Sequence, residues 1–170
     1  TDLRNWLESQ RKNGKSIGFV PTMGALHQGH LSLIETSKQK AEVTVCSIFV
    51  NPTQFNDPAD FSKYPVTIEK DIELLAAAGS TALFLPDVPE IYPNGRPESK
   101  KYELGYLETV LDGSSRPGHF QGVCTVVERL LEIVAPDHLM LGQKDYQQCL
   151  VITRLLELMG NAGNGIQIHI

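Results

Sequence analysis

Hydrophobic residues in this chain fall into two kinds of segment that alternate along the sequence. Short apolar runs, rich in β-branched residues and almost free of charge, predict buried strands at residues 17–20, 43–50, 82–85, 138–141 and 166–170. Longer stretches carry apolar residues at helical spacing and predict helices at residues 3–13, 29–41, 68–78, 106–111, 123–134 and 145–159. The alternation predicts an α/β fold in which helices cover both faces of a doubly wound, Rossmann-like parallel sheet.

Glycine and proline residues set the expected ends of several elements. The helix at 106–111 is expected to end at Gly113, and Pro136 closes the long apolar stripe that starts at Val123. The proline-rich residues 87–101 predict an irregular surface segment. The stripe of the helix at 68–78 consists of Ile68, Ile72, Leu75 and Ala78. With no internal repeat or linker in view, residues 1–170 form one expected domain.

Composition and charge narrow the class of protein. The 170 residues are 41% hydrophobic and carry a formal net charge of −5. This balance argues against a broad nucleic-acid surface, but it allows one anionic ligand in a local pocket. No apolar run approaches the roughly 18–20 residues of a membrane span, and no secretory signal pattern is present. We therefore expect a cytoplasmic protein without nucleic-acid or membrane partners.

Two further features concern the cysteines and the ends of the chain. The cysteines are Cys46, Cys124 and Cys149, an odd number without a Cys-x-x-Cys pair, so we expect reduced, buried thiols. The chain begins with Thr1 and stops within or just after an expected strand. We therefore expect it to be a fragment of a longer protein.

Polar and glycine-rich residues follow three of the expected strands directly, at residues 21–30, 51–55 and 142–148. The carboxyl ends of parallel strands meet at one edge of a sheet, where ligands of such folds bind. The sequence therefore predicts one site at this edge.

The first of these segments contains His27 and His30 with Gly29 between them. At a strand-to-helix turn, glycine lets the backbone approach a phosphate, and the helix start offers free N–H groups. Two imidazoles could donate hydrogen bonds to phosphate oxygens in a transition state. The alternatives are a pair of surface histidines, or a zinc pair that would need further ligands.

Cationic and amide side chains complete the expected site. Lys144 suits phosphate charge, and Asp145 suits a ribose hydroxyl or the surroundings of Mg²⁺, although a solvated helix start is the alternative for both. Gln54 and Gln148 each offer a donor and an acceptor to a hydroxylated ligand. Arg116 and His119 precede the longest stripe and could face an anion, or could belong to a plain loop.

Several segments together resemble the pantothenate synthetase family, the pantoate–beta-alanine ligases of the His-x-Gly-His nucleotidyltransferase superfamily. They are VPTMGALHQGH at 20–30, SIFVNPTQF at 47–55, IYPNG at 91–95, SRPGHFQGV at 115–123 and GQKDYQQ at 142–148. The resemblance runs from about residue 15 to 160 and implies an N-terminal, Rossmann-like domain that binds ATP and pantoate. In this family pantoate attacks the α-phosphate of Mg-ATP to give pantoyl adenylate and pyrophosphate. β-Alanine then displaces AMP to give pantothenate, the precursor of coenzyme A.

The resemblance also implies roles for individual residues. The expected catalytic residues are His30, His27 and Lys144. The expected ATP contacts are Met23, Gly24, Ala25, Leu26, His27, Gln28, Gly29, His30, Gly142, Gln143, Lys144 and Asp145. Gln54 and Gln148 are expected to bind pantoate, with Gln54 also near β-alanine. Asn51, Tyr64, Arg116 and His119 are expected to line the site. No protein-held metal is implied, Mg²⁺ arriving with the nucleotide, and similar enzymes are homodimers.

The sequence departs from the family pattern in two places, of which the first is expected to have little effect if its position contributes mainly backbone contacts. Gln143 stands where the family usually has Glu, which removes one negative charge beside Lys144. The chain also ends before the Lys-Met-Ser-like segment and the small C-terminal domain of the family, so poor activity is expected of residues 1–170 alone. The rival hypotheses are a nucleotidyltransferase of the same superfamily and a non-enzymatic nucleotide-binding domain.

Overall fold

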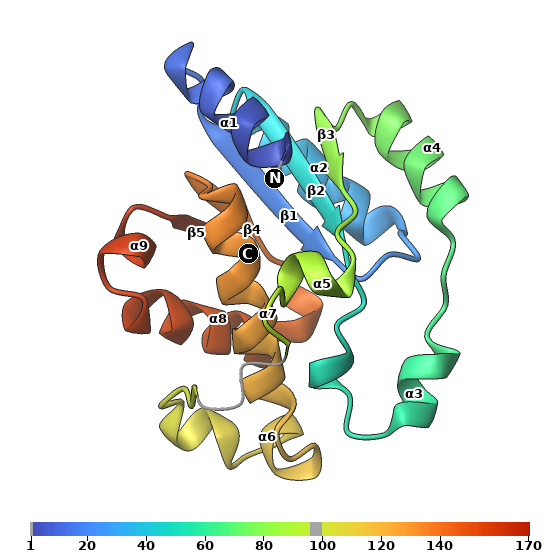
Figure 1. The fold of residues 1–170 in the computed structure, drawn as a ribbon, viewed down its shortest axis with the longest axis vertical. Helices are drawn as coiled ribbons and strands as arrows, with labels where there is room; N and C mark the ends of the chain where they lie inside the picture. Colours follow the sequence, from blue (N-terminus) through green and yellow to red (C-terminus); the bar gives the residue numbers. More distant parts are fainter. Residues whose placement is uncertain (1, 96–99) are drawn as a thin grey trace.

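The structure, a computed structural model, describes residues 2–95 and 100–170 and contains within them a five-stranded sheet in the order β3-β2-β1-β4-β5 (Figure 1). The strands are β1 (Ile17–Thr22), β2 (Val43–Ile48), β3 (Ala82–Phe84), β4 (His138–Met140) and β5 (Gln167–His169). All four neighbouring pairs are parallel. The order reverses between β1 and β4, so the predicted doubly wound parallel sheet is confirmed.

Helices cover both faces of the sheet. The described helices are α1 (Asp2–Lys12), α2 (Gln28–Lys40), α3 (Pro58–Lys63), α4 (Ile68–Ala78), α5 (Val88–Ile91), α6 (Asp112–Ser115), α7 (His119–Val134), α8 (Tyr146–Leu158) and α9 (Asn161–Asn164). Short 3-10 turns are η1 (Pro52–Gln54), η2 (Gly105–Glu108) and η3 (Gln143–Asp145). One core cluster joins α2 and α4 to the sheet, and a larger one joins α1, α7 and α8 to its other face.

Helix α7 is the centre of the larger core. Its predicted stripe is confirmed, since Val123, Val127 and Leu131 are all buried. The helix ends at Val134; its C-cap residue, Ala135, has a positive φ of 45°, and Pro136 follows as predicted. Helix α1 packs beside it, and the Arg11 guanidinium donates to the carbonyl of Ala135 at 3.0 Å. Burial of this stripe therefore fixes α7 against the sheet.

The expectation of an irregular surface segment at residues 87–101 is wrong in part. Residues 96–99 lie outside the described part of the chain, but α5 occupies 88–91. Ile91 and Tyr92 belong to the larger core. Pro89 lies in the first turn of α5, where no N–H donor is needed, so this proline begins a helical turn that leads to the buried Ile91 and Tyr92.

The expected helix at 106–111 with a stop at Gly113 is also wrong. Residues 105–108 form η2, and α6 begins at Asp112, so that Gly113 lies inside a helix. A Cβ at Gly113 would lie 2.7 Å from the carbonyl carbon of Glu108. Gly113 allows η2 and α6 to pack closely. In the sequence, a glycine with this role cannot be told from a glycine that ends a helix.

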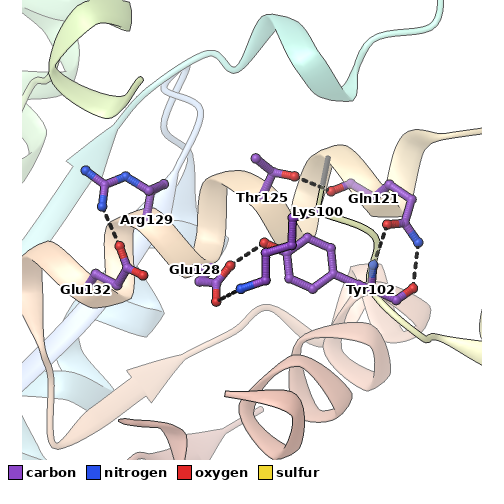
Figure 2. Close-up of polar contacts among 7 residues, drawn as sticks. All are labelled: Lys100, Tyr102, Gln121, Thr125, Glu128, Arg129 and Glu132. Atoms are coloured by element: carbon purple, nitrogen blue, oxygen red, sulfur yellow. Dashed lines mark hydrogen bonds and ion pairs between the residues drawn. The ribbon is translucent and has the colours of Figure 1, made fainter. Parts of the chain in front are cut away.

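The irregular segment at residues 100–104 is tied to α7 by polar contacts of Lys100 and Tyr102, which Figure 2 shows. The Gln121 amide accepts from the N–H of Tyr102 at 2.9 Å and donates to its carbonyl at 2.8 Å. Glu128 accepts from the Tyr102 hydroxyl and pairs with Lys100. Burial is the largest cause that raises the pKa of the Tyr102 phenol far above its usual range, and the hydrogen bond to Glu128 is the second. These contacts anchor the chain before it enters η2 and α6.

Two whole-chain expectations concern the cysteines and membrane spans. Cys46, Cys124 and Cys149 are buried and free, as predicted, and burial raises the pKa of Cys46 and Cys124 to about 12. Within the residues that the structure describes, no helix combines the length and the apolar character that a membrane crossing requires.

Helix α7 meets the turn η1 at Gly122, where the backbones approach most closely. A Cβ at Gly122 would lie 2.5 Å from the Thr53 carbonyl oxygen and 2.7 Å from the Gln54 Cα. The Gly122 carbonyl also accepts from the Asn51 amide at 3.1 Å. The contact fixes η1, and with it Gln54, relative to α7.

We predict that Gly122→Ala lowers the free energy of unfolding by about 1–3 kcal/mol, because the added methyl meets rigid backbone. The measurement is urea unfolding of the protein. Gly165→Ala is the matched control, since a Cβ there meets no atom within 4 Å. Equal stability of the two variants would contradict the close contact at Gly122.

Candidate functional site

A cavity of about 540 Å³ opens at the carboxyl edge of the sheet. Its walls come from the segments that follow β1, β2 and β4, and from α6 and the start of α7. The lining residues are Met23, Gln54, Phe55, Tyr64, Leu111, Asp112, Arg116, His119, Phe120, Lys144, Asp145, Tyr146, Gln147 and Gln148. The topology thus brings together residues that lie more than a hundred positions apart in the sequence.

The cavity contains part of the expected site. Met23, Gln54, Tyr64, Arg116, His119, Lys144, Asp145 and Gln148 line it. Gly24, Ala25, Leu26, His27, Gln28, Gly29, His30, Gly142 and Gln143 lie in the adjoining segments and are not among the lining residues. His30 is nevertheless close enough for the charges of Asp145 and Lys144 to act on its pKa.

Asn51 lies beneath the cavity and does not line it. The residue is only 1% exposed. Its amide donates to the Gly122 carbonyl, and its amide oxygen accepts from the Thr53 N–H at 3.2 Å and from the Tyr92 hydroxyl at 2.9 Å. Asn51 therefore supports η1 from below, at the position where the family resemblance places a lining residue.

The two histidines of residues 23–30, which we call the β1 loop, cap helix α2 reciprocally. His27 is the N-cap residue, and its Nδ1 accepts from the Gly29 N–H at 3.1 Å. His30 Nδ1 accepts from the His27 N–H, also at 3.1 Å. Because Nδ1 is the acceptor in both rings, the ring proton of each neutral imidazole is on Nε2. Both rings can therefore donate an Nε2–H to a ligand.

This capping changes which hydrogen-bond donors the start of α2 offers to a ligand. The helix start was expected to offer free N–H groups, but the Gly29 N–H is engaged by His27. The rings lie 4.1 Å apart, centre to centre. Burial lowers the pKa of His30, and the neighbouring His27 lowers it further. The negative charges of Asp71 and Asp145 act in the opposite direction. At neutral pH the loop thus presents ring N–H donors where free backbone donors were expected.

Asp71 on α4 was not predicted as a site residue, yet it holds the β1 loop. Its carboxylate accepts from the N–H groups of Ala25 and Leu26, each at 2.9 Å, and from the Thr67 hydroxyl at 3.2 Å. Ala25 has a positive φ of 50°. That conformation costs an L-residue about 1–2 kcal/mol. Hydrogen bonds to a charged group contribute about 1.5–3 kcal/mol each, so the two backbone bonds outweigh the strain.

The apolar stripe expected on α4 is wrong at one position. Ile72 is 44% exposed, whereas Asp71 is 0% exposed. Asp71 stands three residues after Ile68 and four before Leu75, so it occupies the stripe position given to Ile72. A carboxylate at that spacing was the sequence signal for a buried, hydrogen-bonded acid.

His119 connects Gln54 to Arg116. Its Nδ1 lies 2.9 Å from the Gln54 carbonyl oxygen, which can only accept, so the proton is on Nδ1. Nε2 is then the acceptor for the Arg116 guanidinium at 3.5 Å. Burial lowers the pKa of His119, and the Arg116 charge lowers it further. A neutral His119 therefore orients a cation at the cavity wall.

Adjacent glutamines on α8 have different surroundings. The Gln147 amide donates to the carbonyls of Leu107 and Val110 and accepts from the Asp112 N–H. It holds the cavity wall formed by η2 and α6. Gln148 also lines the cavity, and its amide makes no hydrogen bond within residues 2–95 and 100–170. Only the second amide is available to a ligand.

Charged groups of both signs face the cavity. Arg116 and Lys144 supply cations, and Asp112 and Asp145 supply carboxylates. Burial, then the Asp145 charge, raises the pKa of the Tyr64 phenol, so Tyr64 remains a neutral donor. Among the described residues no three His, Cys, Asp or Glu side chains gather as a metal site. The cavity can bind an anion while offering oxygen atoms to a cation that accompanies it.

Comparison with known proteins shows similarity along the whole chain. Residues 1–168 match the family model described as pantoate-beta-alanine ligase. The pantothenate synthetase of Cytophaga hutchinsonii is 51% identical over 154 residues, which are 91% of this chain and 54% of that protein. The pantothenate synthetase of Moorella thermoacetica is 53% identical over the same shares of both chains. The chain therefore spans about half the length of the curated relatives that it matches.

Solved structures show the same likeness. The pantoate-beta-alanine ligase of Francisella tularensis, crystallised with beta-gamma ATP and beta-alanine, is 43% identical, with a TM-score of 0.87 over 98% of this chain and 64% of that one. The pantothenate synthetase of Thermus thermophilus is 41% identical, with a TM-score of 0.84 over 96% of this chain and 58% of that one.

We predict that the free energy of unfolding falls as the pH drops below about 6.5. The pKa values of His30 and His119 are lowered in the folded chain, so the unfolded chain binds their protons first. Their contribution is complete above the unfolded pKa and is lost as the pH falls toward the folded pKa values. Urea unfolding at pH 7.5 and 5.5 measures the change.

The control is the double variant His30→Gln with His119→Gln, which should show a smaller difference between the two pH values. His169, whose pKa burial also lowers, remains in that variant, so some dependence should persist. A wild-type stability that is equal at both pH values would contradict this assignment.

Proposed function

Because the chain belongs to the pantoate-beta-alanine ligase family, we propose that it forms the ATP- and pantoate-binding part of an enzyme that condenses pantoate with β-alanine to pantothenate. The observation that carries the proposal is the grouping, in one cavity and in the β1 loop beside it, of phosphate donors and a hydroxyl-binding amide. The donors are His27, His30 and Lys144, and the amide is that of Gln148.

The reaction proceeds in two steps. A pantoate carboxylate oxygen attacks the α-phosphorus of ATP, the bond to the β-phosphate oxygen breaks, and pyrophosphate leaves. The β-alanine amine then attacks the acyl carbon of pantoyl adenylate, the acyl–oxygen bond breaks, and AMP leaves while the amine loses a proton. Negative charge grows on the phosphates in the first step, where neutral Nε2–H donors and the Lys144 cation stabilise it.

The remaining site residues bind and orient the substrates. The Gln148 amide pairs with a pantoate hydroxyl, and Gln54 contributes from the turn η1, where its amide already donates to Met23 Sδ at 3.3 Å. Arg116, oriented by His119, faces the pantoate carboxylate. Mg²⁺ arrives with the nucleotide, and Asp145 offers it the hard oxygen ligand that it prefers.

We further propose that residues 1–170 are the N-terminal domain and that a smaller C-terminal domain closes over the nucleotide. The length of the relatives supports this, since the chain spans 54% of the synthetase from Cytophaga hutchinsonii. The buried, free cysteines support a cytoplasmic location. The homodimeric state of similar enzymes is carried over as part of the same proposal.

The decisive experiment is pantoate-dependent exchange of labelled pyrophosphate into ATP by the full-length protein, followed by product analysis with β-alanine. Free AMP and pantothenate support the ligase. An adenylated end product would identify a nucleotidyltransferase of the same superfamily. ATP binding without any exchange would identify a non-enzymatic nucleotide-binding domain.

We predict that His30→Ala in the full-length protein lowers the exchange rate by about 10²-fold or more, because a donor to the developing phosphate charge is lost. His30→Gln keeps an acceptor for the His27 N–H and so preserves the cap. It should be as stable as the wild type and still lose activity. Exchange within a few-fold of the wild type in His30→Ala would show that the ring has no such role.

We predict that Gln148→Leu weakens pantoate binding by about 1–3 kcal/mol, because a substrate hydroxyl is left unpaired. The KM for ATP should barely change. Gln147→Leu is the contrast, since that amide holds the η2 segment and its loss should lower thermal stability. Steady-state kinetics for both substrates separate the cases, and a joint loss of ATP and pantoate affinity in Gln148→Leu would indicate a structural role.

A further inference from the structure

Asp71 stands apart from the other acidic residues of the chain. Among the described residues it is the only acidic side chain that is buried. Its position in the first turn of α4 favours a negative charge there. Its carboxylate accepts hydrogen bonds from the β1 loop, which is distant in the sequence, and from Thr67, the N-cap residue of α4. A buried carboxylate with these partners is a connection between α4 and the β1 loop.

We propose that Asp71 is a positioning residue for the nucleotide: its carboxylate holds the β1 loop in the binding conformation before the ligand arrives. The inference rests on the proposed function, because the β1 loop is taken to contact ATP. Asp71 itself does not line the cavity, so it acts through the loop and not on the substrate.

A short series of contacts leads from Asp71 to the histidines. The carboxylate fixes the N–H groups of Ala25 and Leu26. The next residue is His27, whose own N–H donates to His30 Nδ1. Each ring orientation is therefore defined relative to a backbone that Asp71 holds. The side chain of Leu26 is buried in the smaller core, which anchors the same residue from the other side.

The chemistry of the contact requires a carboxylate. The two backbone donors approach different oxygen atoms, Oδ2 from Ala25 and Oδ1 from Leu26. An asparagine offers one acceptor oxygen, and its NH₂ group would face the second N–H donor. Asp71→Asn thus keeps the size of the side chain and removes half of the connection. A Cβ at Gly24 would lie 3.2 Å from Oδ2, so the loop approaches this carboxylate closely.

The test compares Asp71→Asn with Glu73→Gln, which neutralises an exposed acid on the same helix. Pyrophosphate exchange by the full-length protein is measured while the substrates are varied separately, at a temperature where each variant is folded. We expect the KM for ATP to rise at least about tenfold in Asp71→Asn, because displaced groups lose orientation, while the KM for pantoate stays within about threefold. Glu73→Gln should match the wild type.

A merely structural Asp71 gives a different pattern. Fewer folded molecules lower kcat and leave both KM values unchanged, and a collapse of the whole site raises both KM values together. Either pattern overturns the inference. An absence of pyrophosphate exchange in the wild type would instead contradict the proposed function. The role of Asp71 would then be tested by hydrogen exchange of the backbone amides.

Hydrogen exchange in the wild-type protein provides that measurement and needs neither activity nor a folded variant. Without ligand, the amide hydrogens of Ala25 and Leu26 should exchange at least about a hundredfold more slowly than their intrinsic rates. Saturating Mg-ATP should add little protection, since the loop is already held. Amides that exchange at intrinsic rates until ATP binds would overturn the inference.

Discussion

The parallel pairing of β1 with both β2 and β4 is the constraint on which the rest of the structure depends. The chain builds β2 and β3 to one side of β1 and then returns to place β4 and β5 on the other side. The segments that follow β1 and β4 therefore leave the sheet side by side, with the turn after β2 as a third neighbour. The Lys144 cation and the β1 loop are neighbours for this reason, although more than a hundred residues separate them in sequence.

The walls of the cavity are supported by polar side chains, of which His119 and Gln147 also line the cavity and Asn51 does not. Asn51 braces η1 against Gly122, His119 joins Gln54 to Arg116, and Gln147 holds the wall formed by η2 and α6. Each of these polar side chains has its partners within the protein. Cavity-lining groups without a hydrogen-bond partner in the described residues, such as the Gln148 amide, therefore lie next to residues that are held in place by hydrogen bonds. Such support is what a binding site needs to keep its geometry when empty.

The strands and long helices could be predicted because burial on one or both faces imposes a period on the sequence. The edge of the sheet at which the cavity opens followed from the polar residues after the strands. Asp71 was missed although its spacing from Ile68 and Leu75 fits the buried stripe, because Ile72 next to it gave an equally good apolar stripe. Gly113 resembled a helix stop, since close packing and chain termination both select glycine. Gln147 and Gln148 are chemically identical, and only their partners in space tell them apart.

The reciprocal capping of α2 by His27 and His30 has a consequence for the kind of attraction that the β1 loop can exert. Both rings are neutral donors, so they meet an anion with oriented dipoles and not with net charge. Mobile ions screen interactions between exposed charges over about 10 Å at an ionic strength of 0.1 M, but they weaken a direct hydrogen bond far less. The attraction that the loop exerts is thus largely insensitive to ionic strength, whereas the attraction of the Lys144 and Arg116 cations for an anion weakens as salt is added.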